Sequence, residues 1–379
     1  MPWKEAKLMY LRVEFVHLAE KDDANISELC RQFGISRKTG YKWIGRYQEG
    51  GKAALADQSR RPQHSPNKTP IFIEDLIIGT RMEHSAWGGR KIKAYLERKK
   101  HDDIPTASTI TEILRRADLI NPEDAAKHKP FQRFEMEKPN ELWQMDFKGY
   151  FSLAEGGECH PLTILDDHSR YLVGLKACAN ETRKTVQENL CEVFGQYGLP
   201  DRMLMDNGSP WGYMYDHPYT ALTAWLIHLG IKVSHGKPYH PQTQGKDERL
   251  HRTLNEELIR QYPMANLAQC QKAFDQWRKM YNSERPHESL KMDTPCDHYQ
   301  PSNKPFPKYL KPITYPPGYL VRKVDQSGGI YFQNRRHRIG KAFRYSLVGL
   351  YQDEVCDNIM NVFFCDEIVA KISYRKDNC

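Results

Sequence analysis

The spacing of apolar residues changes twice along this 379-residue chain. Up to about residue 121, apolar residues recur every three or four positions, as they do along one face of a helix. From residue 139 to about 300, short strand-like runs alternate with helical patterns, and from about residue 310 only short β-patterns remain. This order predicts a multidomain protein with all-α N-terminal domains, a central α/β core with a mixed sheet and a small C-terminal β-barrel.

Connectors between these regions are rich in Gly, Pro, Ser and charged residues. The predicted organisation is a helical domain at 1–58, a linker at 59–69, a second helical domain at 70–121, a linker at 122–138, an α/β core at 139–300 and a β-rich domain at 310–379. No internal repeat interrupts this order.

Positive charge is concentrated in two distant segments. The whole chain has a net charge of +8. Residues 31–62 carry eight Lys or Arg against Glu49 and Asp57, and residues 310–350 carry eight against Asp325 alone. Such runs are often only solvated surface, but two of them favour contact with a polyanion at more than one point.

Cysteine and hydropathy patterns exclude several classes of protein. The nine cysteines are scattered, without a C-x-x-C pair or Cys/His ligand spacing, so neither a zinc site nor a disulfide framework is expected. No apolar run approaches the ~18 residues of a membrane span, and the N-terminus lacks a signal-peptide pattern. We therefore expect a soluble protein of the reduced cytoplasm.

The segment "ISELCRQFGISRKTGYKWIGRYQ" predicts two short helices joined by a tight turn. Asn25 caps the first helix with Glu28 as its capping-box partner, Gly34 ends it, and Ser36 caps the second helix. Such a helix-turn-helix places the first turn of its second helix in the DNA major groove. The candidate DNA-binding residues there are Arg37, Lys38, Thr39 and Lys42. The alternative is a helical bundle without DNA contact.

Further basic residues follow in the linker and the second helical domain. Arg60 and Arg61 lie in the linker, where they are expected to follow a phosphate backbone. In "SAWGGRKIKAYLERKK", Trp87 is expected in the core, with Arg90 and Lys91 facing outward toward DNA. A purely structural three-helix domain remains the alternative.

Three acidic residues lie on different predicted elements of the central region. Asp146 lies within an apolar strand, where an ionised carboxylate needs a compensating cation or donor. Asp206 ends a second apolar strand, and Glu248 begins a helix after the loop "HPQTQG". Carboxylates from three rigid elements suit Mg²⁺, and two such ions about 3.5–4 Å apart would support an in-line displacement at phosphorus. Taken singly, each could be an ordinary capping or surface acid.

Five sequence blocks resemble one known family. "WQMDFKGYF", "DDHSRYLVG", "LMDNGSPW", "HPQTQGKDERLHRTLNEEL" and "YNSERPHESL" are similar to the signature blocks of bacterial insertion-sequence transposases. These form a retroviral-integrase-like group with a DDE catalytic core of ribonuclease H fold. The resemblance implies that Asp146, Asp206 and Glu248 are the catalytic acids and bind two Mg²⁺ or Mn²⁺ ions. One departure is the 41 residues between Asp206 and Glu248, somewhat more than is usual in the group.

Residues beside the third acid include another carboxylate and several cations. Asp247 shares a helix face with Leu250 and Leu254, so the motif match rather than periodicity selects Glu248. The resemblance also makes nearby cations candidate phosphate contacts, namely Lys246, Arg249 and Arg252. His240 and Gln242 would lie in the loop beside the reacting phosphodiester, and a general-base role for His240 is the alternative.

Two other groups of residues near the predicted core are assigned differently. Asp166 and Asp167 are expected to shape a hairpin turn rather than to bind metal. The sequence leaves open whether the last core helix is stabilised, or DNA contacted, by Tyr281, Arg285, Pro286 and His287.

The resulting hypothesis is a transposase that binds the terminal inverted repeats of its element. It would nick their 3′ ends and transfer them into target DNA, as a homo-oligomer on paired ends, in the bacterial cytoplasm near the nucleoid. One alternative is a catalytically silent DNA-binding regulator derived from a transposase. Another is a nuclease of RNA–DNA hybrids, which the helix-turn-helix disfavours because such modules read duplex DNA.

Overall fold

A computed structural model describes residues 5–57, 68–120, 135–212, 219–236, 245–356 and 358–374. The chain forms two compact units, Met1–Lys68 and Thr69–Cys379. Among the described residues, no helix combines the length and the apolar character that crossing a membrane requires.

The first unit is helical, and its caps form largely as the sequence predicts. It consists of α1 (Glu5–Ala19), α2 (Ile26–Gln32), α3 (Arg37–Gly50) and η1 (Gly51–Leu55). Asn25 accepts hydrogen bonds from the backbone of Ser27 and Glu28, and Ser36 accepts one from Thr39. Gly34 adopts the predicted positive φ of 65°. Glu28 does not complete a capping box; its carboxylate lies 3.0 Å from Arg31.

Three further helices begin the second unit. They are α4 (Ile71–Glu83), α5 (Gly89–Arg98) and α6 (Ala107–Arg116), with Thr106 capping α6 through the backbone of Thr109. Trp87 is fully buried among apolar residues of all three helices, which confirms its prediction as core.

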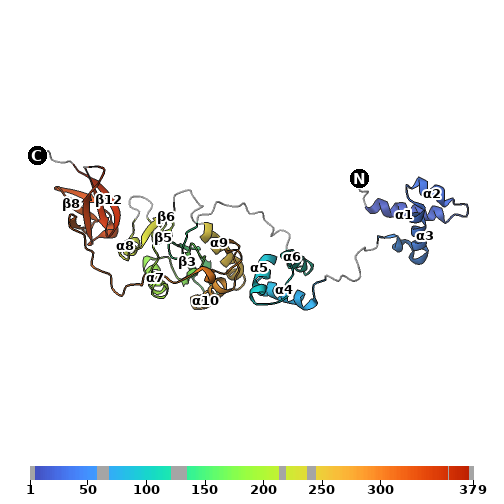
Figure 1. Cartoon of the computed structure of the whole chain (residues 1–379), viewed down its shortest axis with the longest axis horizontal. Helices are drawn as coiled ribbons and strands as arrows, with labels where there is room; N and C mark the ends of the chain where they lie inside the picture. The colour runs from blue at the N-terminus through green and yellow to red at the C-terminus, as the bar shows by residue number, and fades with distance from the viewer. Residues whose placement is uncertain are drawn as a thin grey trace. The chain divides into compact units, whose positions relative to one another are not determined.

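A mixed sheet forms the centre of the second unit (Figure 1). Its strands are β1 (Trp143–Phe147), β2 (Phe151–Ser152), β3 (Glu158–Asp166), β4 (Leu172–Cys178), β5 (Arg202–Met205) and β6 (Lys232–His235). The order is β2-β3-β1-β5-β6, with β4 also paired to β3. The β1–β3 and β3–β4 pairs are antiparallel, whereas β1–β5 and β5–β6 are parallel.

Helices cover both faces of this sheet. On one face, α7 (Arg183–Tyr197) and α8 (Ala221–His228) pack on Trp143, Met145 and their neighbours. On the other, α9 (Gly245–Leu254) and α10 (Leu267–Ser283) pack on Leu165, Leu172 and Leu175. A π-helical turn, η4 (Asn255–Ile259), extends α9, and the short elements η5 (Glu288–Leu290) and α11 (Pro295–His298) follow α10.

The C-terminal region is rich in β-structure. Its elements are β7 (Leu320–Lys323), β8 (Gly329–Phe332), β9 (Arg335–Arg338), η6 (Lys341–Phe343), β10 (Leu347–Gln352), β11 (Ile359–Phe364) and β12 (Glu367–Ser373). Four strands form an antiparallel sheet in the order β12-β11-β10-β7, and β8 and β9 form a separate hairpin. The described residues contain no closed sheet, so the predicted small barrel is not confirmed. Apolar residues of this region pack against Ala224 and Ile227 of α8.

Candidate active site

Asp146 is the fourth residue of β1. Side chains alternate along a strand, and because Trp143 and Met145 pack toward α7, Gln144 and Asp146 face the side covered by α9. Asp146 is half-buried there. Its backbone carbonyl accepts a hydrogen bond from the Thr163 hydroxyl, 3.0 Å away on β3.

Asp206 follows directly after β5 and is held in a tight corner. Its Oδ1 accepts hydrogen bonds from the Gly208 amide at 2.9 Å and from Nε1 of the buried Trp211. The Trp211 ring stacks on Phe147, the last residue of β1, with ring centroids 5.4 Å apart. Gly212 closes the corner, where a Cβ would lie 2.4 Å from the Asn207 backbone. The "LMDNGSPW" block therefore folds back onto β1.

The register of the parallel strands brings these two aspartates together. Trp143 pairs with Met203 and Gln144 with Leu204. Continued by two residues, the same register sets Asp146 beside Asp206, with strands about 4.8 Å apart. Burial, and then the negative charge of Asp206, raise the pKa of Asp146 to about 7. A divalent cation would offset the repulsion between two carboxylates as close as these.

Glu248 lies in the first turn of α9, but its side chain is exposed. The adjacent Asp247 is buried with Leu250 and Leu254, as their shared helix face predicts. Burial, and then the charge of Asp146, raise the pKa of Asp247 well above its usual value. Within the described ranges, no three Asp, Glu, His or Cys side chains lie close enough to hold a metal ion. The structure thus brings Asp146 and Asp206 together and leaves Glu248 apart from them.

His251 identifies the flank of α9 that faces β3 beside Asp146. Its Nε2 lies 2.8 Å from the hydroxyl of Thr163, which donates its own hydrogen to the Asp146 carbonyl. Since burial lowers the pKa of His251 to about 4, the ring is neutral at pH 7 and Nε2 carries its proton. Glu248 lies three residues before His251, one helical turn away on a neighbouring flank.

The sequence did not reveal how α9 is joined to the sheet. Lys246 Nζ lies 2.5 Å from Oδ1 of Asp167, and the same oxygen accepts a 2.6 Å hydrogen bond from Gln144. Asp166 accepts hydrogen bonds from Ser169 and from the Asn140 backbone, as a turn-forming residue does. Except for Asn140, these residues lie in the quoted blocks, but spacing alone gives no indication that they are in contact.

The other predicted DNA-binding residues lie at several places. Arg37, Lys38 and Lys42 are exposed on the first turns of α3, and Thr39 is half-buried beside the cap. Arg90, Arg249 and Arg252 are also exposed. Arg60, Arg61, His240 and Gln242 lie outside the described residues.

Lys91 differs from the prediction that it faces outward. It is half-buried, and burial, followed by the charge of Arg285, lowers its pKa to about 8. Arg285 forms a buried ion pair with Glu257 at 2.9 Å, so this residue has a structural contact. Tyr281 and His287 are also buried, and their rings lie 4.7 Å apart.

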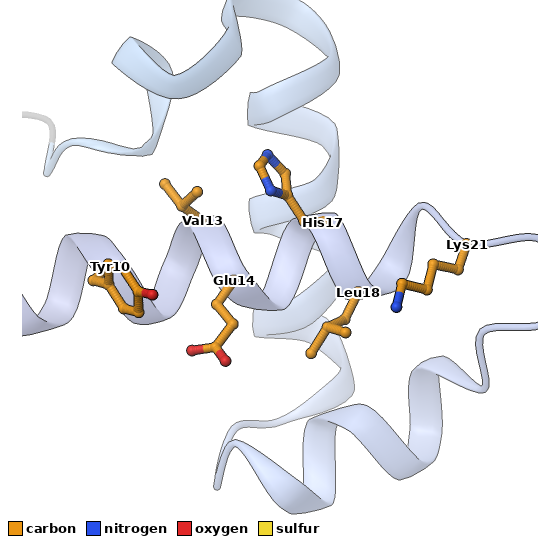
Figure 2. Close-up of a pocket in the computed structure, with 6 residues that line it drawn as sticks. All are labelled: Tyr10, Val13, Glu14, His17, Leu18 and Lys21. Carbon is orange, nitrogen blue, oxygen red and sulfur yellow. The ribbon is translucent and has the colours of Figure 1, made fainter.

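Two hollows in the surface lie away from the acids. Figure 2 shows one of about 370 Å³ along α1, lined by Tyr10, Val13, Glu14, His17, Leu18 and Lys21. Another, of about 900 Å³, is lined by residues from 82–87 and 257–280. Asp146, Asp206 and Glu248 line neither hollow, so these hollows do not provide a substrate pocket for the acids.

Comparison with known families finds matches for most of the chain. The Integrase core domain matches residues 136–241 and again 229–295. A Helix-turn-helix domain matches residues 11–63, and a Homeodomain-like domain matches 39–114. The C-terminal domain of the IS481 family transposases matches residues 319–379. The chain belongs to the integrase-like transposases of bacterial insertion sequences.

Individual relatives of this transposase are distant in sequence. A 39.2 kDa protein of insertion element IS476 from Xanthomonas euvesicatoria is 24% identical over 60% of this chain and 65% of its own length. A 31.7 kDa protein of insertion element IS407 from Burkholderia multivorans is 23% identical over 74% and 92%. The transposase of Tn552 from Staphylococcus aureus is 25% identical over 63% and 54%.

Solved structures with some similarity are retroviral integrases. The simian T-cell lymphotropic virus intasome in complex with PP2A regulatory subunit B56 gamma matches 76% of this chain and 91% of its own, at 16% identity and a TM-score of 0.38. The HTLV-2 integrase catalytic core in complex with magnesium matches 43% and 97%, at 15% identity and a TM-score of 0.33.

Proposed function

We propose that this transposase binds the terminal inverted repeats of its element, nicks their 3′ ends and joins those ends to target DNA. The observation that carries the proposal is the parallel β1–β5 register, which sets Asp146 beside Asp206 on the sheet face covered by the helix of Glu248. Integrase core and insertion-element relatives support the same reaction class.

Both proposed steps exchange one phosphorus–oxygen bond for another. In the nick, a water oxygen bonds to phosphorus at the element end, and the bond from phosphorus to the 3′-oxygen breaks. In strand transfer, that 3′-hydroxyl oxygen bonds to a target phosphorus and displaces the target's own 3′-oxygen. Such transfers depend mainly on positioning and on stabilisation of charge.

Asp146, Asp206 and Glu248 would hold two Mg²⁺ or Mn²⁺ ions. The donor set fits, because two adjacent carboxylates with a raised pKa at Asp146 are relieved by a hard cation with oxygen ligands. When bound, the ions would activate the attacking oxygen and stabilise the leaving one. The chain's own part is to orient these acids: Gly208 and Trp211 fix Asp206, and β-pairing fixes Asp146.

Recognition of the element ends would come from α3. Arg37, Lys38 and Lys42 are exposed donors on its first turns, and no acidic residue lies there. The exposed side chains of Arg249 and Arg252 suit contact with phosphates beside the reacting bond. Because the reaction joins two ends, we include assembly of several copies on DNA in the proposal.

The test is a strand-transfer assay with Mn²⁺ and labelled duplexes from the DNA that flanks the gene. The native chain should nick and join these ends, and Asp146→Asn, Asp206→Asn and Glu248→Gln should bind them without joining. A chain that shifts the duplexes but never cuts them would be a silent regulator. Full activity in any of the three variants would refute the assignment of that acid.

A further inference from the structure

A buried ion pair joins the first turn of α9 to the turn between β3 and β4. Lys246 Nζ lies 2.5 Å from Asp167 Oδ1 and 3.2 Å from the Asp167 carbonyl oxygen. The side chains of Lys246 and Asp167 are 17% and 0% exposed. An exposed pair exchanges readily with water, whereas removing one partner of a buried pair leaves an uncompensated charge. This contact therefore has a defined geometry.

Asp167 is itself fixed from several sides. Its Oδ1 accepts a hydrogen bond from Gln144 at 2.6 Å, and its Oδ2 accepts one from the Met136 amide at 2.9 Å. Its own amide donates to the Leu142 carbonyl at 2.9 Å. A carboxylate held on both oxygens cannot rotate away, so it offers Lys246 a fixed acceptor.

The contacts connect the elements that carry two of the proposed acids. Lys246 lies two residues before Glu248 on α9, and Gln144 lies two residues before Asp146 on β1. Gln144 and Asp146 share the strand face that α9 covers. We propose that the Lys246–Asp167–Gln144 bridge positions the first turn of α9, which carries Glu248, against β1, which carries Asp146. This inference rests on the proposed function and makes Lys246 a positioning residue.

A second contact supports this assignment. His251, three residues after Glu248, is hydrogen-bonded to Thr163, which bonds to the Asp146 backbone. Glu248 therefore lies on α9 between Lys246 and His251. Each of these two residues is connected to β1 through one other residue, Asp167 or Thr163. The exposed Arg252 on the same helix has a different environment, since its side chain is open to solvent. We thus assign Lys246 a structural contact with the sheet and Arg252 a contact with DNA phosphate.

The experiment compares Lys246→Met with three other variants. Lys246→Arg keeps the charge, Lys176→Met removes one partner of the more exposed Lys176–Glu192 pair as a control, and Arg252→Met removes a proposed phosphate contact. The double variant Lys246→Met/Asp167→Asn removes both buried charges, so that no carboxylate is left unpaired if the single variant fails to fold. Each is measured for Mn²⁺ binding by electron paramagnetic resonance, for binding to the end duplexes at several salt concentrations, and for strand transfer.

We expect Lys246→Met and the double variant to lose about 10–100-fold in Mn²⁺ affinity or strand transfer, as when groups that orient metal ligands are removed. Binding to the end duplexes and its salt dependence should stay unchanged. Lys246→Arg should recover most of the loss, and Lys176→Met should match the native chain. Arg252→Met should weaken DNA binding and reduce the salt slope by about one.

Two results would overturn the bridge. If Lys246→Met weakened DNA binding and reduced the salt slope as Arg252→Met does, Lys246 would be a phosphate contact. If the folded double variant bound Mn²⁺ and transferred strands like the native chain, the bridge would have no positioning role. Failure of the proposed function looks different, because the native chain itself would then bind the end duplexes without nicking or joining them.

Discussion

The sheet and the helix that carry the proposed acids are held in different ways. Asp146 and Asp206 lie on or directly after strands whose separation is set by backbone pairing. Glu248 lies on α9, which pairs with no strand and contacts the sheet through side chains such as Lys246 and His251. Backbone pairing survives most side-chain substitutions, whereas a side-chain contact is lost in a single substitution. We therefore expect the helix to be the more easily perturbed half of the site.

The largest expected effect comes from the sheet acids themselves. Asp146→Asn keeps the shape of the side chain but removes its charge, so strand transfer should fall at least about 10³-fold, because ligand charge contributes several kcal/mol to catalysis. Initial rates with Mn²⁺ and pre-nicked ends measure this. Binding of the end duplexes, measured in parallel, should be unchanged. Retention of native rates would remove Asp146 from the site.

The far end of the helix offers the next largest effect. Arg285 forms an ion pair with Glu257 of the π-helical turn, and both side chains are less than 10% exposed. Arg285→Met should lower the free energy of unfolding by about 3–5 kcal/mol, because it leaves Glu257 buried and unpaired. Urea titration checks this value.

An exposed pair provides the control for that measurement. Lys184 and Glu188 lie 3.8 Å apart with side chains 83% and 66% exposed, so Lys184→Met should change stability by less than about 1 kcal/mol. Equal effects of the two substitutions would show that the buried pair does not secure the helix.

Substitution of Asp247 tests whether Asp247 or Glu248 is the acid of α9 that serves the reaction. Its Oδ1 is buried without a hydrogen-bond partner. Asp247→Val should therefore raise the free energy of unfolding by about 1–3 kcal/mol, since an unsatisfied polar group is replaced by an apolar one. Strand transfer should persist. Loss of transfer here, together with its retention in Glu248→Gln, would exchange the roles of the two acids.

The metal-free protein should also show a pH dependence of stability. Asp146 has a pKa of about 7 in the fold against an ordinary 3.8, so the folded state binds its proton more tightly than the unfolded state. The stability it contributes is complete below about pH 4 and declines as pH rises to about 7. Melting temperatures measured across this range should fall less steeply in Asp146→Asn than in the native chain. Identical slopes would contradict the raised pKa.

Local sequence patterns predicted much of the fold. Asn25 and Ser36 cap their helices as expected because a cap depends on residues two or three positions away. Trp87 is buried because the apolar pattern of its region is strong. The strand-like run around Asp146 also predicted correctly that the chain changes to strands there.

Contacts between distant residues were not predictable in the same way. The ion pair of Lys246 with Asp167 joins residues 79 positions apart, and no periodicity encodes it. The expected barrel is not confirmed for a similar reason, since short alternating strands are compatible with an open sheet and with a closed one. The positions of Leu250 and Leu254 predict that Asp247 is buried and Glu248 exposed on α9. They do not predict which of the two acids binds metal.

The packing of the β-rich region on α8 affects how this protein can be divided. Ala224 and Ile227 are covered by that region, Tyr219 meets Phe343 edge to face, and His228 bonds to the Lys311 carbonyl. A fragment ending after α11 would expose this apolar helix face to water, where such surfaces promote aggregation. A fragment that lacks the β-rich region would thus be poorly soluble. Biochemical work is better done with the central sheet and the β-rich region kept in one chain.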